Sequence, residues 1–160
     1  MKTKFSAPIN KKFQKALYIV EKLKNYGFES YIVGGAVRDM LLDQEPEDFD
    51  ITTSALPEDV ERIFPLTIPV GKTFGVMMVI VEKLPFEVAT FRSDGKYIDG
   101  RRPEKVVFSS VEQDVKRRDF TINSLLLNPE TFEVKDFVGG RADLHKKIIR
   151  AIGSPEKRFG

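Results

Sequence analysis

The stretch from Tyr31 to Ile51 constrains the fold more than any other part of this 160-residue chain. It starts with a short β-prone apolar run, stops at Gly34-Gly35 and continues with a helical pattern from Ala36 to Leu42. A short loop then leads to Asp48-Phe49-Asp50-Ile51, which is expected to begin the next strand. The stretch therefore predicts two strands that are joined through a glycine turn and a short helix.

The glycine turn has the features of a phosphate-binding segment. Gly34 and Gly35 allow backbone N–H groups to turn towards a bound anion, because no Cβ is in the way. The N-terminus of the helix that follows adds a partial positive charge at the same place. Arg38 lies in the first turn of that helix, and its guanidinium can donate two hydrogen bonds to phosphate oxygens.

The two aspartates that follow are spaced for a divalent metal ion. On a strand, residues two apart point to the same side, so Asp48 and Asp50 project together while Phe49 and Ile51 face the core. Two neighbouring carboxylates repel each other unless a cation lies between them, and hard oxygen ligands suit magnesium. A phosphate cradle and a metal site so close in sequence are the two halves of a nucleotidyl-transfer centre.

Glu87 is an acid within an otherwise apolar strand expected from Phe86 to Phe91. Alternation places it on the face opposite Phe86 and Val88. The pattern supports two readings equally: a third carboxylate beside the two aspartates, or a surface glutamate on an edge strand.

Basic residues gather in two later segments. Arg117-Arg118-Asp119 lies on a helix-like segment, where ion pairing could orient the side chains and leave one arginine for a triphosphate. The alternative is a surface salt bridge. Arg101-Arg102 ends a polar segment, Arg92 to Lys105, which has no periodicity and is expected to be a mobile loop. These arginines either contact phosphates or are solvated.

Composition narrows the class of protein. The chain has no cysteine, which excludes disulfides, thiolate chemistry and Cys-based zinc sites, and its single histidine, His145, excludes a histidine cluster. No apolar run approaches membrane-spanning length, and the N-terminus lacks the apolar region of a secretory signal. A cytoplasmic location and no membrane partner are expected.

Apolar periodicity predicts the remaining elements. A helix from Lys11 to Tyr26 should end at Gly27, with an apolar stripe made by Phe13, Ala16, Leu17, Val20 and Leu23. Short helices are expected to begin near Pro57, after Ser110 and at Gly139-Gly140. Further strands are expected at Thr67 to Val70, Gly75 to Val81, Val106 to Phe108, Leu125 to Leu127, Phe132 to Phe137 and Ile148 to Ile152.

Four motifs follow one another along the chain: Gly34-Gly35-Ala36-Val37-Arg38-Asp39, Asp48-Phe49-Asp50-Ile51, Arg101-Arg102-Pro103 and Arg117-Arg118-Asp119-Phe120-Thr121-Ile122-Asn123. In this order and spacing they resemble the bacterial-type (class II) CCA-adding tRNA nucleotidyltransferases and the related bacterial poly(A) polymerases. The resemblance runs from about Tyr31 to Phe159. It implies an α+β fold, a polymerase-β-like nucleotidyltransferase head domain with a mixed sheet flanked by helices.

The resemblance also implies roles for individual residues. It places nucleotide binding at Gly34, Gly35, Arg38, Arg117, Arg118 and Asp119, catalysis at Asp48, Asp50 and Glu87, and magnesium binding at Asp48 and Asp50. Within the arginine motif, Arg118 would bind the triphosphate and Asp119 would orient an arginine. Two Mg²⁺ ions, ATP or CTP and the 3′ end of a tRNA are the implied cofactors and partners.

Three segments are expected: an N-terminal arm and helix at 1–28, the head domain at 29–153, and the start of a truncated neck helix at 154–160. Members of this family continue into a neck that selects the base and into body and tail domains that hold tRNA. The chain alone is therefore expected to bind NTP weakly and tRNA little.

Other functions stay open at this point. Full CCA addition, CC-only addition, A-only addition and poly(A) synthesis share the same head motifs. A non-catalytic nucleotide- or RNA-binding module would keep the glycine turn and the basic clusters without needing Asp48 and Asp50 together. A purely structural reading would make the aspartates loop caps and the arginine motif a salt bridge.

Overall fold

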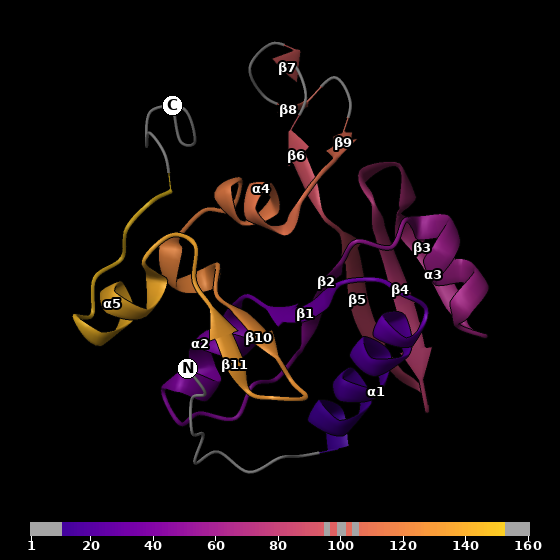
Figure 1. The fold of residues 1–160 in the computed structure, drawn as a ribbon, viewed down its shortest axis with the longest axis horizontal. Helices are drawn as coiled ribbons and strands as arrows, with labels where there is room; N and C mark the ends of the chain where they lie inside the picture. The colour runs from indigo at the N-terminus through magenta and orange to yellow at the C-terminus, as the bar shows by residue number, and fades with distance from the viewer. Residues whose placement is uncertain (1–10, 95–96, 99–101, 104–105, 153–160) are drawn as a thin grey trace.

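A computed structural model of the chain describes residues 11–94, 97–98, 102–103 and 106–152. In this part, seven strands form a mixed sheet in the order β11-β10-β1-β2-β5-β4-β3 (Figure 1). Neighbours β2 and β5 run parallel, and the other neighbouring strands of this sheet run antiparallel. The expected N-terminal arm, Arg101 and the expected start of a neck helix lie outside the described residues.

The strands of this sheet are β1 (Ser30–Val33), β2 (Asp50–Thr53), β3 (Thr67–Gly71), β4 (Val76–Val81), β5 (Leu84–Thr90), β10 (Leu126–Asn128) and β11 (Glu133–Lys135). The helices are α1 (Lys11–Asn25), α2 (Gly35–Leu41), α3 (Pro57–Ile63), α4 (Val111–Lys116) and α5 (Gly140–His145). Short 3-10 turns are η1 (Lys72–Phe74) and η2 (Thr121–Asn123). Most of the predicted elements are confirmed within a residue or two of their expected ends.

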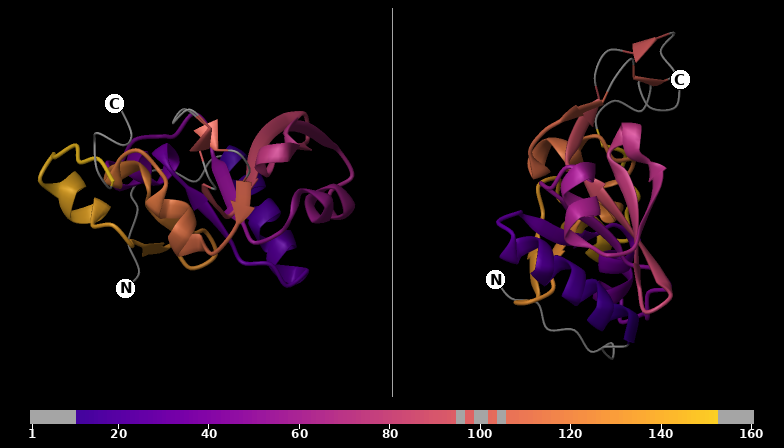
Figure 2. Two further views of the ribbon diagram at one scale, coloured as in Figure 1. Left: turned by 90° about the horizontal axis from the view of Figure 1, so that it is seen from above. Right: turned by 90° about the vertical axis from the view of Figure 1, so that its right-hand side faces the viewer.

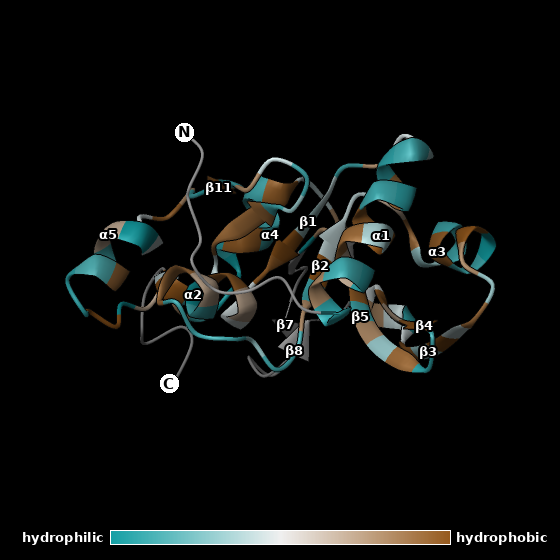
Figure 3. Cartoon of the chain, turned by 90° about the horizontal axis from the view of Figure 1, so that it is seen from below, coloured by the Kyte–Doolittle hydropathy of each residue, from teal (hydrophilic) through white to brown (hydrophobic). Residues whose placement is uncertain are grey.

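Helices α1, α2 and α3 cover one face of the sheet. The expected stripe on α1 is buried, with Ile19 in place of the half-buried Leu17. It packs with Val37 of α2, Val60 of α3 and Val88 of β5 in one continuous core. Hydrophilic and hydrophobic segments alternate along α1 and α3 (Figure 3), as expected for helices with one face against a sheet.

Helix α4 covers part of the opposite face. Ser110 caps it by accepting a hydrogen bond at Oγ from the N–H of Gln113, at 3.3 Å, as the sequence predicted. Val111 and Val115 of this helix pack on Tyr31 and Leu126 of the sheet. The part of this face formed by β2, β5 and β4 carries the candidate site.

The segment expected to be a mobile loop contains paired strands. β6 (Arg92–Asp94) pairs with β9 (Val106–Phe108), and β7 (Tyr97–Ile98) pairs with β8 (Arg102–Pro103). These pieces project from one end of the sheet (Figure 2). The strand expected at Val106 to Phe108 is confirmed as β9, whereas β6, β7 and β8 were not predicted, because strands of two or three residues are too short to show a periodicity.

The prediction of a strand from Ile148 to Ile152 is wrong. This segment forms a single β-bridge, between Ala151 and Phe120. The ladder cannot continue because the partner segment turns into η2 at Thr121. Among the described residues, no helix is both long enough and apolar enough to cross a membrane.

Candidate active site

Asp48 and Asp50 lie at the start of β2. Asp50 pairs with Val33, the last residue of β1, and so lies beside the glycine turn. The strand begins at Asp50 and not at Asp48, yet the alternation holds: Phe49 and Ile51 are buried, and both aspartates are exposed. The predicted pair of outward-facing carboxylates is therefore present.

Glu87 lies next to this pair. Strand β5 lies between β2 and β4, so the reading of Glu87 as a residue on an edge strand is wrong. Ile51 pairs with Val88 in the parallel ladder, and one step back along both strands brings Asp50 beside Glu87. The sheet thus brings Glu87, which is distant in the sequence, to the neighbouring carboxylates of Asp48 and Asp50.

The pKa of Asp50 is raised from 3.8 to about 6. Loss of surrounding water is the largest cause, the charge of Glu87 is the second, and Asp48 adds to it, while Arg118 acts in the opposite direction. The outer side of Asp50 stays exposed, so a cation can reach it. A bound cation would relieve the repulsion, which makes the carboxylate group a fitting receptor for a divalent metal ion.

The glycine turn adopts a backbone that favours glycine. Gly34 has φ 85° and ψ −142°, a region that residues with a Cβ rarely adopt. Its N–H donates a hydrogen bond to the carbonyl of Leu125, at 3.3 Å, which fixes the turn against the segment before β10. The predicted turn is confirmed, and α2 begins at Gly35 directly after it.

Arg38 folds back over this turn. A Cβ on Gly35 would lie 3.4 Å from Nη2 of Arg38, so the guanidinium lies against the glycine. Nη1 of Arg38 donates to Oδ1 of Asn123, at 2.7 Å, and Nε and Nη2 donate to Oδ1 of Asp39. These contacts hold the arginine at the glycine turn, where the sequence placed it.

Asp114 holds the two later arginines, and the sequence reading did not single it out. Its carboxylate is fully buried and accepts hydrogen bonds from Nε of Arg117, at 3.3 Å, and from Nη2 of Arg118, at 3.1 Å. It also accepts from the N–H of Arg92 and from Oγ1 of Thr52. Its position three residues before Arg117 and four before Arg118 is the spacing of ion pairs on a helix, and this spacing could have predicted the contact.

Two cationic side chains gather around Asp114. Its one carboxylate accepts hydrogen bonds from the guanidiniums of Arg117 and Arg118. Arg118 lies close enough to Asp50 to lower its pKa, which places the charge of this arginine beside the carboxylates. Nε of Arg118 is buried and has no hydrogen-bond partner among the described residues, so this corner of the site favours an anion.

Asp119 has a different place from the one expected. In the described part of the chain its carboxylate makes no ion pair with Arg117 or Arg118, and Asp114 orients both. Asp119 is exposed, and its backbone carbonyl accepts the N–H of Ile152. A contact between Asp119 and a nucleotide stays a prediction.

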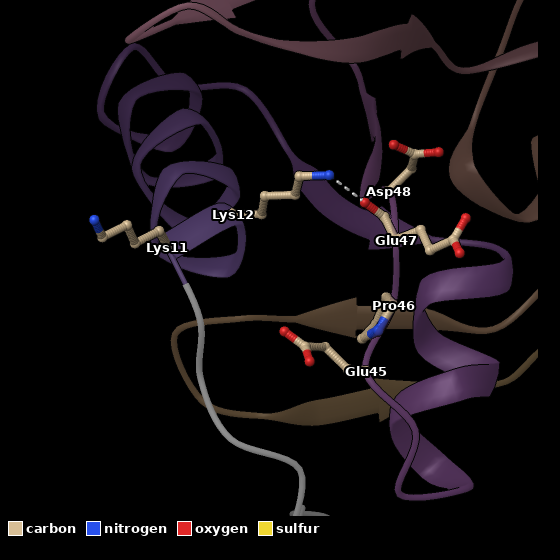
Figure 4. Close-up of a pocket in the computed structure, with 6 residues that line it drawn as sticks. All are labelled: Lys11, Lys12, Glu45, Pro46, Glu47 and Asp48. Carbon is tan, nitrogen blue, oxygen red and sulfur yellow. Dashed lines mark hydrogen bonds between the residues drawn. The ribbon is translucent and has the colours of Figure 1, made fainter.

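An open depression of about 680 Å³ adjoins Asp48 (Figure 4). It is lined by Lys11, Lys12, Glu45, Pro46, Glu47 and Asp48. Lys12 extends from α1 and donates a hydrogen bond to the carbonyl of Glu47, at 2.7 Å, whereas Lys11 points away from this loop. The contact ties the loop that presents Asp48 to the first helix.

The described residues contain no group of three or more His, Cys, Asp or Glu side chains set closely enough to hold a metal ion by themselves. The carboxylates of Asp48, Asp50 and Glu87 therefore form an open arrangement and not a closed cage. The single histidine, His145, is exposed on α5.

Comparison with known families places this site in context. Residues 30–150 match the Poly A polymerase head domain family. The chain is 51% identical over 148 residues to the CCA-adding enzyme of Geobacillus stearothermophilus, covering 92% of this chain and 36% of that protein. It is 48% identical over 148 residues to the CCA-adding enzyme of Streptococcus gordonii, with 92% and 37% covered. The chain thus spans little more than a third of these relatives.

Solved structures give the same result. The crystal structure of the Bacillus stearothermophilus CCA-adding enzyme in complex with CTP matches with a TM-score of 0.83 and 45% identity, over 94% of this chain and 36% of that one. The Thermotoga maritima CCA-adding enzyme complexed with tRNA matches with a TM-score of 0.68 and 27% identity, over 90% and 33%. The polymerase-β-like nucleotidyltransferase fold predicted from the sequence is confirmed.

Proposed function

The chain belongs to the Poly A polymerase head domain family, and on this premise we propose that it is the nucleotidyltransferase head of a CCA-adding enzyme. The reaction is transfer of CMP or AMP from CTP or ATP to the 3′ end of a tRNA. The observation that carries the proposal is the assembly of Asp48, Asp50 and Glu87 beside the glycine turn and Arg118. The CTP and tRNA complexes of similar enzymes support the choice of substrates.

The proposed reaction has a simple atomic balance. The 3′-hydroxyl oxygen of the RNA forms a bond to the α-phosphorus of the nucleotide. The bond from that phosphorus to the oxygen that bridges the α- and β-phosphates breaks, and pyrophosphate leaves. The hydroxyl proton passes to solvent. The RNA gains one nucleotide, and no oxidant or reductant is required.

We propose that two magnesium ions bind at this site. Asp48 and Asp50 would hold them, and Glu87 would add a third carboxylate beside them. Their oxygen donors, their exposure and the repulsion that raises the pKa of Asp50 fit a hard divalent cation. When bound, magnesium lowers the pKa of a coordinated hydroxyl and neutralises charge on a leaving pyrophosphate. The open arrangement leaves positions for phosphate oxygens and waters, which this ion retains in most sites.

Arg118, Arg38 and the glycine turn would bind and orient the triphosphate. Asp114 holds Arg118 in place, the buried Nε of Arg118 has no hydrogen-bond partner among the described residues, and Arg38 lies across the glycine turn. Gly34 and Gly35 keep the turn free of side chains. Donors that are already held in place stabilise developing negative charge without having to reorganise during the reaction. Contacts of Arg117 and Asp119 with the nucleotide are part of the same proposal.

A transfer assay tests the proposal. Because the chain spans 36% of its Geobacillus stearothermophilus relative, it is assayed alone and fused to the remaining segment of that enzyme. Each protein is incubated with magnesium, one labelled NTP at a time and tRNA that lacks its 3′ end. We expect the fusion to add C and A with magnesium only. A fusion without incorporation, although folded, would contradict the proposal.

The same assay separates the second candidate, poly(A)-type tailing, which the name of the matched family favours. A tailing enzyme would extend RNA with a run of A and would not stop after a fixed number of nucleotides. A binding module would bind NTP without needing magnesium, which calorimetry with and without the metal would show.

A further inference from the structure

We propose that the hollow on the far side of Glu87 holds the 3′-terminal nucleoside of the acceptor RNA, with its base against Phe74. This inference rests on the proposed function and adds to it a site for the second substrate. The residues concerned are Val70, Gly71, Phe74, Val76, Met78, Glu87 and Arg92, which line a space of about 520 Å³.

A continuous row of residues crosses the sheet at this level. Val33 pairs with Asp50, Asp50 lies beside Glu87, Glu87 pairs with Met78, and Met78 pairs with Ile68. The glycine turn follows Val33 at one end of the row. The hollow lies at the other end, and Glu87 belongs both to the carboxylate group and to the hollow.

This order fits the geometry of the proposed reaction. In an in-line displacement the attacking oxygen and the leaving oxygen lie on opposite sides of the phosphorus. If Arg38 and the glycine turn hold the phosphates that leave, the 3′-hydroxyl approaches from the β5 and β4 side. The hollow is the recess on that side of the carboxylates.

The chemistry of the hollow suits an unpaired base. Val70 and Phe74 are large apolar residues that are 53% and 44% exposed, and Val76 and Met78 are half-buried beside them. Bases of single-stranded RNA stack on aromatic side chains, and such stacking tolerates any base. An acceptor whose last base changes after each addition needs a contact of this kind.

Arg92 supplies a positive charge at the rim of the hollow. Its Nη1 donates a hydrogen bond to the backbone carbonyl of Phe74, at 2.9 Å, which holds the guanidinium beside this residue. Its Nε is buried and has no partner among the described residues. A phosphate on the 5′ side of the terminal nucleoside would match this charge. Through its N–H, Arg92 is also held by Asp114, which orients Arg118.

Binding of a non-reactive acceptor tests the inference. The probe is the dinucleotide CpC with a 3′-deoxy end, added to the chain with and without MgCTP. The methyl groups of Val70, Val76 and Met78 are followed by NMR. We expect their signals to shift on titration with the dinucleotide, and the Phe74→Ala variant to bind it about tenfold more weakly, the size typical for loss of one stacking contact.

Matched variants separate stacking from general effects. Phe74→Tyr keeps the ring and should retain the affinity for the dinucleotide. Phe137→Ala removes another exposed phenylalanine, 39% exposed, in the segment between β11 and α5, and should change nothing. Melting temperatures of all three variants are recorded. MgCTP affinity should be equal in Phe74→Ala and the wild type, because the side chain of Phe74 is not among the groups proposed to bind the triphosphate.

The possible failures are distinguishable. If MgCTP binds but the dinucleotide does not shift the three methyl signals, or if Phe74→Ala binds it as well as the wild type, the inference is wrong and the proposed function stands. If MgCTP does not bind the wild type while the dinucleotide still occupies the hollow, the proposed function fails and the RNA site remains.

Discussion

One face of the sheet is divided into two halves with opposite character. Over β1 and β10, Val33 and Leu126 are buried under Val115 of α4. Over β2 and β5, Asp50 and Glu87 occupy positions of the same kind but face solvent. Both halves follow the same alternation of strand residues, so the alternation does not decide which positions become core. The placement of one six-residue helix does.

The boundary between the halves carries its own chemistry. Asp114 lies on α4 and is fully buried, and it receives hydrogen bonds from Thr52 of β2 and from the first residue of β6. The arginines that follow α4 are thereby held at the edge of the open half. Packing in the covered half thus fixes the charged groups of the open half.

The largest expected effect comes from the carboxylates of the open half. Asp48→Ala or Asp50→Ala should lower magnesium-dependent transfer by the fusion enzyme on the order of a thousandfold or more, because the metal ligands are lost. Both residues are exposed, so the fold should persist by circular dichroism. Glu47→Gln is the matched control, a neighbouring exposed acid that should keep its activity. Activity like that of the wild type in an aspartate variant would rule out the metal assignment.

Substitutions in the covered half should lower the stability of the protein and should not act on the transfer reaction directly. Leu126 is fully buried, and Leu126→Ala should lower the free energy of unfolding by about 2–5 kcal/mol. Met78→Ala, in the half-buried row beside Glu87, should cost about 1 kcal/mol or less. Urea denaturation measures both. Equal losses would show that the two halves do not differ in packing.

Substitution of Asp114, at the boundary between the two halves, should affect both stability and nucleotide binding. Asp114→Asn keeps the shape but removes the charge that holds Arg117 and Arg118. We expect the affinity for MgATP to fall about tenfold, the size of one lost charge-assisted contact, while the affinity for AMP stays the same. Calorimetry measures both ligands.

Two variants on α4 serve as controls for this experiment. Glu112→Gln breaks an exposed pair with Lys116 and should alter stability by less than about 0.5 kcal/mol. Val115→Ala destabilises the same helix without touching the arginines. If it weakens MgATP binding as much as Asp114→Asn does, the effect of Asp114 is general destabilisation and not orientation.

The smallest expected effect is on the pH dependence of stability. The pKa of Asp50 is raised to about 6, so the native state holds this proton more tightly than the unfolded state does. Its contribution is therefore complete below about pH 4 and is lost as the pH rises through about 6. Because Asp50 is exposed, solvent screening limits the effect to about 1 kcal/mol or less.

Thermal melts without magnesium, from pH 4 to pH 7, measure this contribution. Asp50→Asn should remove the decline, and the melting temperature of the variant at pH 7 should exceed that of the wild type. Added magnesium should stabilise the wild type more than the variant. A variant that melts below the wild type at pH 7 would contradict the raised pKa.

Local sequence signals located most elements and half of the site. Gly34-Gly35 and the Asp48 and Asp50 pair could be recognised because their meaning depends on neighbours within a few residues. The two readings of Glu87 could not be separated, since only the order of strands shows that β5 is internal. The spacing of Asp114 from Arg117 and Arg118 was a local signal for their ion pairs, but its contacts with Thr52 and Arg92, which come from distant segments, could not be read from the sequence.

The sequence by itself determined most of the strand and helix positions, the glycine turn, and the outward direction of the two aspartates, because these follow from backbone sterics and side-chain alternation. Tertiary structure alone decided that β2 and β5 are parallel neighbours, that Glu87 joins Asp50, and that α4 covers one half of a face and leaves the other open. Strand pairing joins residues far apart in the chain, and its energy depends on contacts that no local pattern records.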